Sequence, residues 1–139
     1  MEHCIIYFSS SVILFQEADL STLLERSRRN NAALGITGVL LINRGSIIQV
    51  LEGSMDAIKP LYERIERDRR HTNVIKVFEE PISQRLFTDW RMDCKTISAH
   101  QLEITQTMAS LHNADWLSKK PGRDVILSMI KIIYDGLIW

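Results

Sequence analysis

Residues 29–53 read RNNAALGITGVLLINRGSIIQVLEG, and this stretch decides the fold. Its pattern predicts the end of a helix, a buried strand over residues 36–43, a tight turn and a second strand. Gly35 is placed to end the helix, because glycine accepts the left-handed backbone that is common there. The turn residues, 43–46, include an asparagine and a glycine, which is typical of a hairpin. The stretch therefore predicts a helix that leads into a β-hairpin.

Two amides interrupt the apolar pattern of this stretch, Asn31 and Gln49. In the preceding helix, expected over residues 17–31, inward positions recur every three or four residues, and Asn31 is the next of them. On the second strand, alternation places Gln49 on one face with Ile47 and Leu51. A buried amide without partners costs about 1–3 kcal/mol, so each amide is expected to hydrogen-bond another group.

Composition narrows the class of protein. A chain of 139 residues with 45% hydrophobic content predicts one globular domain with a short appendage. Lys and Arg total 17, as do Asp and Glu, so neither nucleic acid nor a membrane is expected as a partner. No apolar run reaches the length of a membrane span, and the N-terminus lacks a signal-peptide pattern. The two cysteines, Cys4 and Cys94, are too few for a disulfide framework, and no His or Cys pair has zinc spacing. We therefore expect a reduced, cytoplasmic protein without a metal site.

The remaining elements complete a β-α-β-β-α-β-β order. Strands are expected over residues 3–9, 73–80 and 89–95, and a helix over residues 55–69. Ser54 is expected to cap this helix. The residues of its inner stripe are Met55, Ile58, Leu61, Tyr62 and Ile65. Two helices on one face of an antiparallel sheet form the α+β ferredoxin-like arrangement, here with one added strand. We expect this domain to occupy residues 1–95.

Residues 96–139 are expected to form a C-terminal helical extension. Helices are predicted over residues 100–113 and 123–134, with a break at Pro121-Gly122. The second of these helices has an apolar stripe. It is expected to pack on the other face of the sheet, with a contact between subunits of a homo-oligomer as the alternative.

The sequence contains no catalytic constellation: a phosphate-cradling glycine loop, a nucleophile elbow and a pair of inward carboxylates are all missing. Polar residues gather instead on inward faces. They are Tyr7, Ser9, Asn31 and Gln49, which Trp90 and Met92 of the last strand can join. Taken singly, each has an ordinary structural explanation, such as a core tyrosine or a helix C-cap. Together they suit a planar ligand with polar edges, bound where the helices meet the sheet.

Five motifs follow one another in a distinctive order and spacing. They are Tyr7-x-Ser9, Asn30-Asn31-x-x-x-Gly35-Ile36-Thr37-Gly38, Ile48-Gln49-Val50-Leu51-Glu52-Gly53, the Arg64 and Asp68 pair, and Asp89-Trp90-x-Met92. Together they closely resemble the BLUF family, blue-light photoreceptors that hold a flavin, usually FAD. The resemblance covers residues 1–95. The rest of the chain has no enzyme-like output domain, so it is similar to the short, stand-alone members, which are not enzymes.

The resemblance implies photochemical roles for five residues. Tyr7 matches the tyrosine that donates an electron and a proton to the excited flavin chromophore. Gln49 matches the glutamine that lies between this tyrosine and the N5/O4 edge of the flavin. Ser9, Trp90 and Met92 match positions that adjust the surroundings of the glutamine and pass its change to the last strand.

The resemblance also implies which residues bind the cofactor, besides Tyr7 and Gln49. Asn31 matches the asparagine that binds the carbonyl–imide edge of the flavin, and Asn30 occupies a neighbouring, variable position. Arg64 and Asp68 match residues that reach the ribityl and phosphate side, and Pro60 could bend the helix that carries them. The sequence leaves FMN open as an alternative to FAD.

The hypothesis is a non-enzymatic sensory-transduction protein that binds FAD non-covalently and signals to an unidentified protein partner. The light signal would leave through Met92, the last strand and the C-terminal helices. The first rival is a light-independent ligand-binding regulatory module of the same ferredoxin-like fold. The second rival, a small hydrolase of acylphosphatase type, lacks the expected phosphate-binding loop with an arginine near the first strand.

Overall fold

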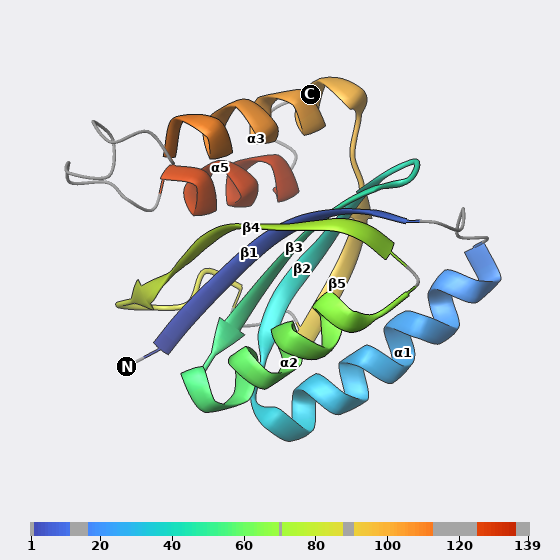
Figure 1. The fold of residues 1–139 in the computed structure, drawn as a ribbon, viewed down its shortest axis with the longest axis vertical. Coiled ribbons are helices and arrows are strands. Elements are labelled where there is room, and N and C mark those ends of the chain that lie inside the picture. The colour runs from blue at the N-terminus through green and yellow to red at the C-terminus, as the bar shows by residue number, and fades with distance from the viewer. Residues whose placement is uncertain (1, 12–16, 70, 88–90, 113–124, 136–139) are drawn as a thin grey trace.

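The computed structural model describes residues 2–11, 17–69, 71–87, 91–112 and 125–135 (Figure 1). In chain order the elements are β1 (Glu2–Ser11), α1 (Glu17–Leu34), β2 (Thr37–Asn43), β3 (Ser46–Gly53), α2 (Met55–Arg67), β4 (His71–Ile82), β5 (Arg91–Thr96), α3 (Ala99–His112) and α5 (Val125–Tyr134). The expectations for Trp90 and for the break at Pro121-Gly122 concern residues outside the described part of the chain.

The five strands form one sheet in the order β4-β1-β3-β2-β5. The first four strands of this order pair antiparallel, which confirms the ferredoxin-like prediction. The added strand differs, because β5 pairs parallel with β2. The chain reverses direction after β4 at one edge and crosses to the other edge, so β5 runs the same way as β1 and β2.

Helices cover both faces of the sheet (Figure 1). The face beneath α1 and α2 carries a core that includes Ile5, Leu51 and Ile58. The opposite face, beneath α3 and α5, carries a second core that includes Ile6 and Ile130. The C-terminal helix thus packs on the other face of the sheet, as the sequence predicts. No helix in the described ranges is both long and apolar enough to cross a lipid bilayer.

Side-chain alternation along β1 and β3 agrees with the period-two prediction. On β1, Ile5 and Tyr7 belong to the core beneath α1 and α2, whereas Cys4 and Ile6 belong to the other core. On β3, Ile47 and Leu51 likewise share one core, and Ile48 and Val50 share the other. Because strand side chains alternate strictly, Tyr7 and Gln49 face the side that α1 and α2 cover.

Helix α1 ends in a turn built on glycine. Gly35 has a φ of 69°, its N–H donates to Ala32 O, and the N–H of Ile36 donates to Asn31 O at 2.8 Å. This pair of bonds is a Schellman motif, in which a left-handed glycine satisfies the last carbonyls of a helix. The helix therefore continues to Leu34, three residues beyond the predicted end, and Asn31 lies within its last turn rather than at its C-cap.

Helix α2 begins as predicted, since the Ser54 hydroxyl accepts a hydrogen bond from the N–H of Ala57 at 3.2 Å. It runs through Pro60 and ends at Arg67, two residues before the predicted end. Ile58 and Tyr62 are its buried residues, whereas Met55, expected on the inner stripe, is 47% exposed. The first turn of the helix therefore lies outside the core, and Ile58 is its first buried residue.

Candidate functional site

Tyr7 and Gln49 are joined directly in the structure. They are opposite each other in the antiparallel pairing of β1 with β3, and their side chains share one face of the sheet. The Tyr7 hydroxyl donates a hydrogen bond to Oε1 of Gln49. Side chains that are directly opposite on neighbouring strands are close enough to interact, so the register itself creates this pair. The phenol and the amide that the sequence singled out are therefore brought together.

The Tyr7 phenol is shielded from water. Its residue is 3% exposed, and its ring packs against the ring of Tyr62 from α2. Burial raises the pKa of the Tyr7 phenol well above its ordinary value, and the neighbouring Tyr62 and the Asp68 carboxylate raise it further. The phenol is therefore harder to deprotonate than a phenol in water. This proton can leave only with strong driving force and a placed acceptor.

Asn31 lies in the last turn of α1 and is 4% exposed. Within the described residues its side-chain amide makes no hydrogen bond, although its backbone carbonyl accepts one from Ile36. An amide contributes two N–H donors and a carbonyl acceptor, and leaving these groups buried and unused is costly. The sequence-based expectation that Asn31 faces inward is confirmed.

The remaining predicted binding residues lie in different surroundings. Ser9 is buried on the same face of β1 as Tyr7, whereas Asn30 and Arg64 are exposed. Asp68 is the C-cap of α2, half-buried, with its N–H bonded to Ile65 O at 3.1 Å. Its carboxylate contributes to the raised pKa of the Tyr7 phenol, after burial and Tyr62.

The two predicted residues of the last strand are less well described. Trp90 lies outside the described residues, and of Met92 the structure describes only its place in β5. The pairing of β2 with β5 shifts register between Gly38 and Val39, which pair with Arg91 and Asp93. Met92 therefore stands at an irregular point of the strand. Because β2 separates β3 from β5, the roles of Trp90 and Met92 beside Gln49 stay predictions.

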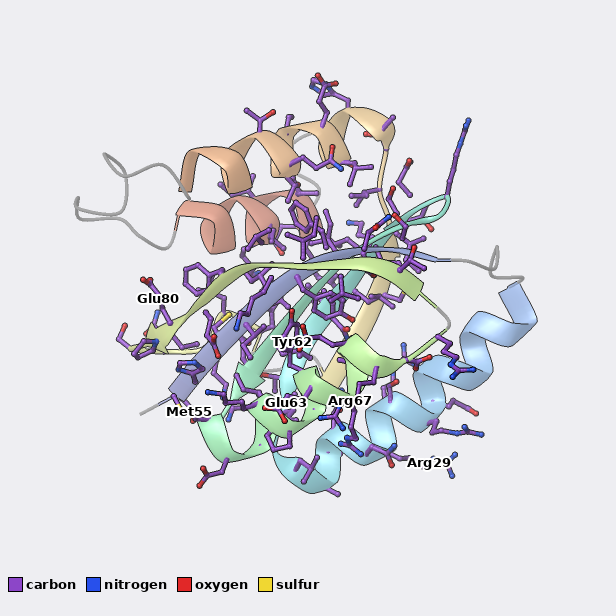
Figure 2. All side chains as sticks on the ribbon, viewed as in Figure 1. Arg29, Met55, Tyr62, Glu63, Arg67 and Glu80 are labelled. Carbon is purple, nitrogen blue, oxygen red and sulfur yellow. The ribbon has the colours of Figure 1, made fainter. Side chains whose placement is uncertain are left out.

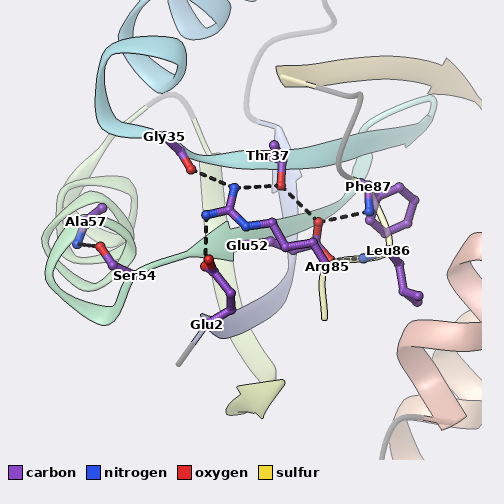
Figure 3. A network of polar contacts seen from close by, with 9 residues as sticks. All are labelled: Glu2, Gly35, Thr37, Glu52, Ser54, Ala57, Arg85, Leu86 and Phe87. Atoms are coloured by element: carbon purple, nitrogen blue, oxygen red, sulfur yellow. Dashed lines mark hydrogen bonds and ion pairs between the residues drawn. The ribbon is translucent and has the colours of Figure 1, made fainter. Parts of the chain in front are cut away.

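A buried carboxylate, Glu52, which the sequence analysis did not single out, lies on the face of β3 opposite to Gln49 and anchors the connection after β4 (Figure 3). It is 0% exposed and accepts hydrogen bonds from the backbone N–H groups of Leu86 at 2.8 Å and Phe87 at 3.1 Å, and from the Thr37 hydroxyl at 3.1 Å. Burial raises the pKa of the Glu52 carboxyl, although the hydrogen bonds and Arg85 oppose this shift. The signal in the sequence was its strand face, which is otherwise apolar.

Arg85 completes this network. Its guanidinium donates to Gly35 O at 2.7 Å and pairs with the Glu2 carboxylate at 2.8 Å (Figure 3). Glu52 and Arg85 together tie the connection after β4 to the end of α1 and to strands β1 and β3. The network thus fixes residues 85–87 of this connection.

Comparison with known proteins identifies the arrangement. Residues 3–93 match the family described as BLUF, sensors of blue-light using FAD. The chain belongs to the BLUF family. The expected family and its class of function, blue-light sensing with a flavin, are confirmed.

Curated relatives of this BLUF chain are much longer proteins. The photoactivated adenylate cyclase subunit beta of Euglena longa is 38% identical over 91 residues, which are 65% of this chain and 11% of that protein. The corresponding subunit of Euglena gracilis is 37% identical over the same share of each chain. This chain therefore spans about a tenth of the length of these relatives and matches only their sensor segment.

Solved structures include a relative of similar length. BlrB, a BLUF protein in its dark state, has a TM-score of 0.73 and 25% identity, and the match covers 99% of this chain and 97% of that chain. Klebsiella pneumoniae BlrP1, solved with FMN and cyclic diGMP, has a TM-score of 0.68 and 29% identity, with 98% of this chain and 35% of that chain covered. A bacterial light-regulated adenylyl cyclase has a TM-score of 0.66 and 27% identity, with 99% and 36% covered.

Proposed function

We propose that this BLUF chain is a stand-alone, non-enzymatic blue-light receptor that binds FAD non-covalently between α1, α2 and the sheet. The observation that carries the proposal is the hydrogen bond from the buried Tyr7 phenol to Gln49. A phenol joined to an amide is the donor and relay that flavin photochemistry of this family requires.

The residues on the helix-covered face fit a flavin. The imide edge of the ring system presents an N–H donor and carbonyl acceptors, and the Asn31 amide presents the complementary groups. Its burial without a hydrogen bond to any described residue supports this role, since a ligand would satisfy it. Gln49 is half-buried on the same face and has a second polar atom beyond the one that Tyr7 engages.

The ribityl and phosphate end of the cofactor would be bound by charged and polar groups. Asn30 and Arg64 are exposed, and Asp68 is half-buried at the end of α2, so all three are accessible to a ribityl chain or phosphate. A guanidinium matches phosphate geometry well. We propose FAD, the flavin in the family's description, with FMN as the alternative.

Tyr7 and Gln49 would divide the photochemistry between them. Excited by blue light, the bound flavin supplies an acceptor for one electron and one proton. Tyr7 can release its electron only as its proton leaves, because burial strongly disfavours a charged phenol. Oε1 of Gln49 accepts the hydrogen bond along which that proton would leave, and an amide, being both donor and acceptor, could relay it. Return of both the electron and the proton to Tyr7 would restore the original oxidation states and leave the amide in a rearranged hydrogen-bond pattern. Donation from the rearranged amide to the flavin's carbonyl would shift absorption to the red.

We further propose that the signal passes through Met92 and β5 to the C-terminal helices and then to a protein partner in the cytoplasm. Lys95 of β5 supports this route, because its ammonium donates to the carbonyl of Tyr134 at the end of α5, at 2.6 Å. Phe87, just after the Glu52-bound turn, packs edge-to-face on the Tyr134 ring with centroids 6.0 Å apart. Two contacts therefore join the last strand and its preceding connection to α5.

The proposal is tested by the colour of the purified protein. A yellow protein with bound flavin is expected, and its spectrum should move to the red under blue light and recover in darkness. A protein that binds flavin without any light-induced shift would favour the light-independent regulatory module. A colourless protein that takes up neither FAD nor FMN would refute the proposal, and phosphate-ester hydrolysis would favour the acylphosphatase-type rival.

A further inference from the structure

Tyr62 covers the phenol on which the photochemistry depends. It is one of the two buried residues of α2 and lies between this helix and the sheet (Figure 2). The ring centroids of Tyr62 and Tyr7 are 5.8 Å apart, with the planes tilted by 58°. Aromatic rings at such separations are in favourable contact. Tyr7 and Tyr62 are only 3% and 5% exposed, so the pair forms a dry contact.

Strand β4 contributes to the position of the Tyr62 ring. Lys76 is opposite Tyr7 in the pairing of β1 with β4, and its ammonium lies 5.3 Å from the centroid of the Tyr62 ring. The same ammonium forms an ion pair with Glu79 on its own strand. A cation over an aromatic face is attracted to it by about 0.5–1 kcal/mol at an exposed site. The Tyr62 ring is thus positioned by α2, which carries it, and by the Lys76 ammonium over its face.

This cover affects where the Tyr7 proton can go. A phenol has a single proton, and here it is donated to Gln49. Water at the phenol would offer another acceptor and would also stabilise the phenolate. Burial is the largest cause of the raised pKa of Tyr7, and electrostatic repulsion by the Tyr62 phenol is the next. The groups that face Tyr7 from the packed elements include Tyr62 of α2, Asp68 at the C-cap of α2, and Gln49 of β3.

We propose that Tyr62 is a positioning residue whose ring keeps water from Tyr7, so that the phenol's proton passes to Gln49 rather than to solvent. The inference rests on the proposed flavin photochemistry for its function. The shielding itself is a property of the chain's own residues and can be measured without flavin.

The first test measures ionisation of Tyr7 in the flavin-free protein, by NMR of isotope-labelled tyrosine. The three tyrosine signals are assigned with single Tyr→Phe variants. Tyr62→Ala should move the titration midpoint of Tyr7 at least about one pH unit down toward the ordinary phenol value of about 10. Tyr62→Phe keeps the ring but loses the phenol whose charge also raises the pKa of Tyr7, so its midpoint should fall by less than that of Tyr62→Ala. Tyr134→Ala removes a buried tyrosine from the opposite face and is the matched control for lost packing.

The second test uses the flavin-loaded protein. Tyr62→Ala should lose most of the yield of the red-shifted state, and the remaining yield should fall as pH rises, whereas Tyr62→Phe should restore a pH-independent yield. If Tyr62→Ala does not fold, Tyr62→Leu refills the apolar volume and should show the same changes to a smaller extent.

A folded Tyr62→Ala or Tyr62→Leu protein in which Tyr7 titrates as in the wild type would overturn the inference. This outcome differs from failure of the proposed function. That function fails if Tyr7→Phe retains the light-induced red shift, whatever the Tyr62 variants do.

Discussion

The proposed light response depends on the side-chain amide of Gln49. Gln49→Leu should still bind flavin, because Asn31 and the polar groups near α2 remain, but it should show no red shift. Leucine has neither a donor nor an acceptor, so no hydrogen bond of the flavin can be rearranged. Absorption difference spectra before and after blue light measure the effect.

Gln106→Leu makes the same chemical change at an exposed position of α3 and controls for it. It should bind flavin and respond to light as the wild type does. A normal photocycle in Gln49→Leu would exclude the glutamine as the switching group.

Glu52 gives the stability of the protein a pH dependence with a definite sign. The pKa of this carboxyl is raised in the folded protein above its ordinary value of 4.5, mainly by burial. Its contribution to stability is therefore fully present below that value and is lost as pH rises through the higher folded pKa. The free energy of unfolding, from urea titrations at a series of pH values, should fall through this window.

Glu52→Gln should remove this pH dependence, because an amide does not titrate. It should also lower stability by about 1–3 kcal/mol, since the carboxylate accepts from two consecutive N–H groups with its two oxygens, and the amide nitrogen of glutamine cannot accept. Glu103→Gln, at an exposed position of α3, is the matched control. An unchanged pH profile in Glu52→Gln would assign the dependence to another group.

At the scale of elements, the end of α1 depends on one backbone conformation. Gly35 has a φ of 69°, and a Cβ placed there would meet no heavy atom within 4 Å. Gly35→Ala should therefore destabilise the protein by about 1–2 kcal/mol through backbone strain alone. Thermal or urea unfolding measures the change.

Gly35→Asn provides the control, because asparagine tolerates the left-handed region better than alanine and should recover part of the loss. Gly53→Ala tests a different cause, since its Cβ would lie 3.2 Å from Cγ2 of Ile58. Equal stability of the wild type and Gly35→Ala would show that the left-handed turn is unimportant for α1.

At the scale of the whole molecule, flavin binding should stabilise the fold. A ligand at a hundred times its Kd adds about 2.7 kcal/mol, so the melting temperature should rise with flavin concentration. The variant Asn31→Leu distinguishes a role of Asn31 in flavin binding from a role in the packing of α1. Without flavin it should be at least as stable as the wild type, because it removes a buried amide with no hydrogen bond to the described residues.

With flavin, Asn31→Leu should gain less stability than the wild type at the same concentration. Differential scanning fluorimetry with and without FAD gives both comparisons. Destabilisation of the flavin-free Asn31→Leu protein would instead indicate that the amide serves the packing of α1.

The sequence by itself determined the elements, the faces of the strands and the family. Alternation placed Gln49 on one face of its strand with Ile47 and Leu51, and glycine chemistry predicted the turn at Gly35. Motif spacing identified Tyr7, Asn31 and Gln49. These features are local, because side-chain period and backbone conformation depend on near neighbours. The exact helix ends were less predictable: α1 continues to Leu34, up to the turn at Gly35, and α2 ends at Arg67, two residues early.

Only the tertiary structure decided which distant residues meet. The strand register joined Tyr7 to Gln49, the docking of α2 laid Tyr62 over Tyr7, and the turn after β4 delivered two N–H groups to Glu52. The parallel pairing of β5 with β2 likewise follows from the path of the whole chain. Such contacts join segments far apart in sequence, and their free energy comes from burying two surfaces together. No local pattern contains that information.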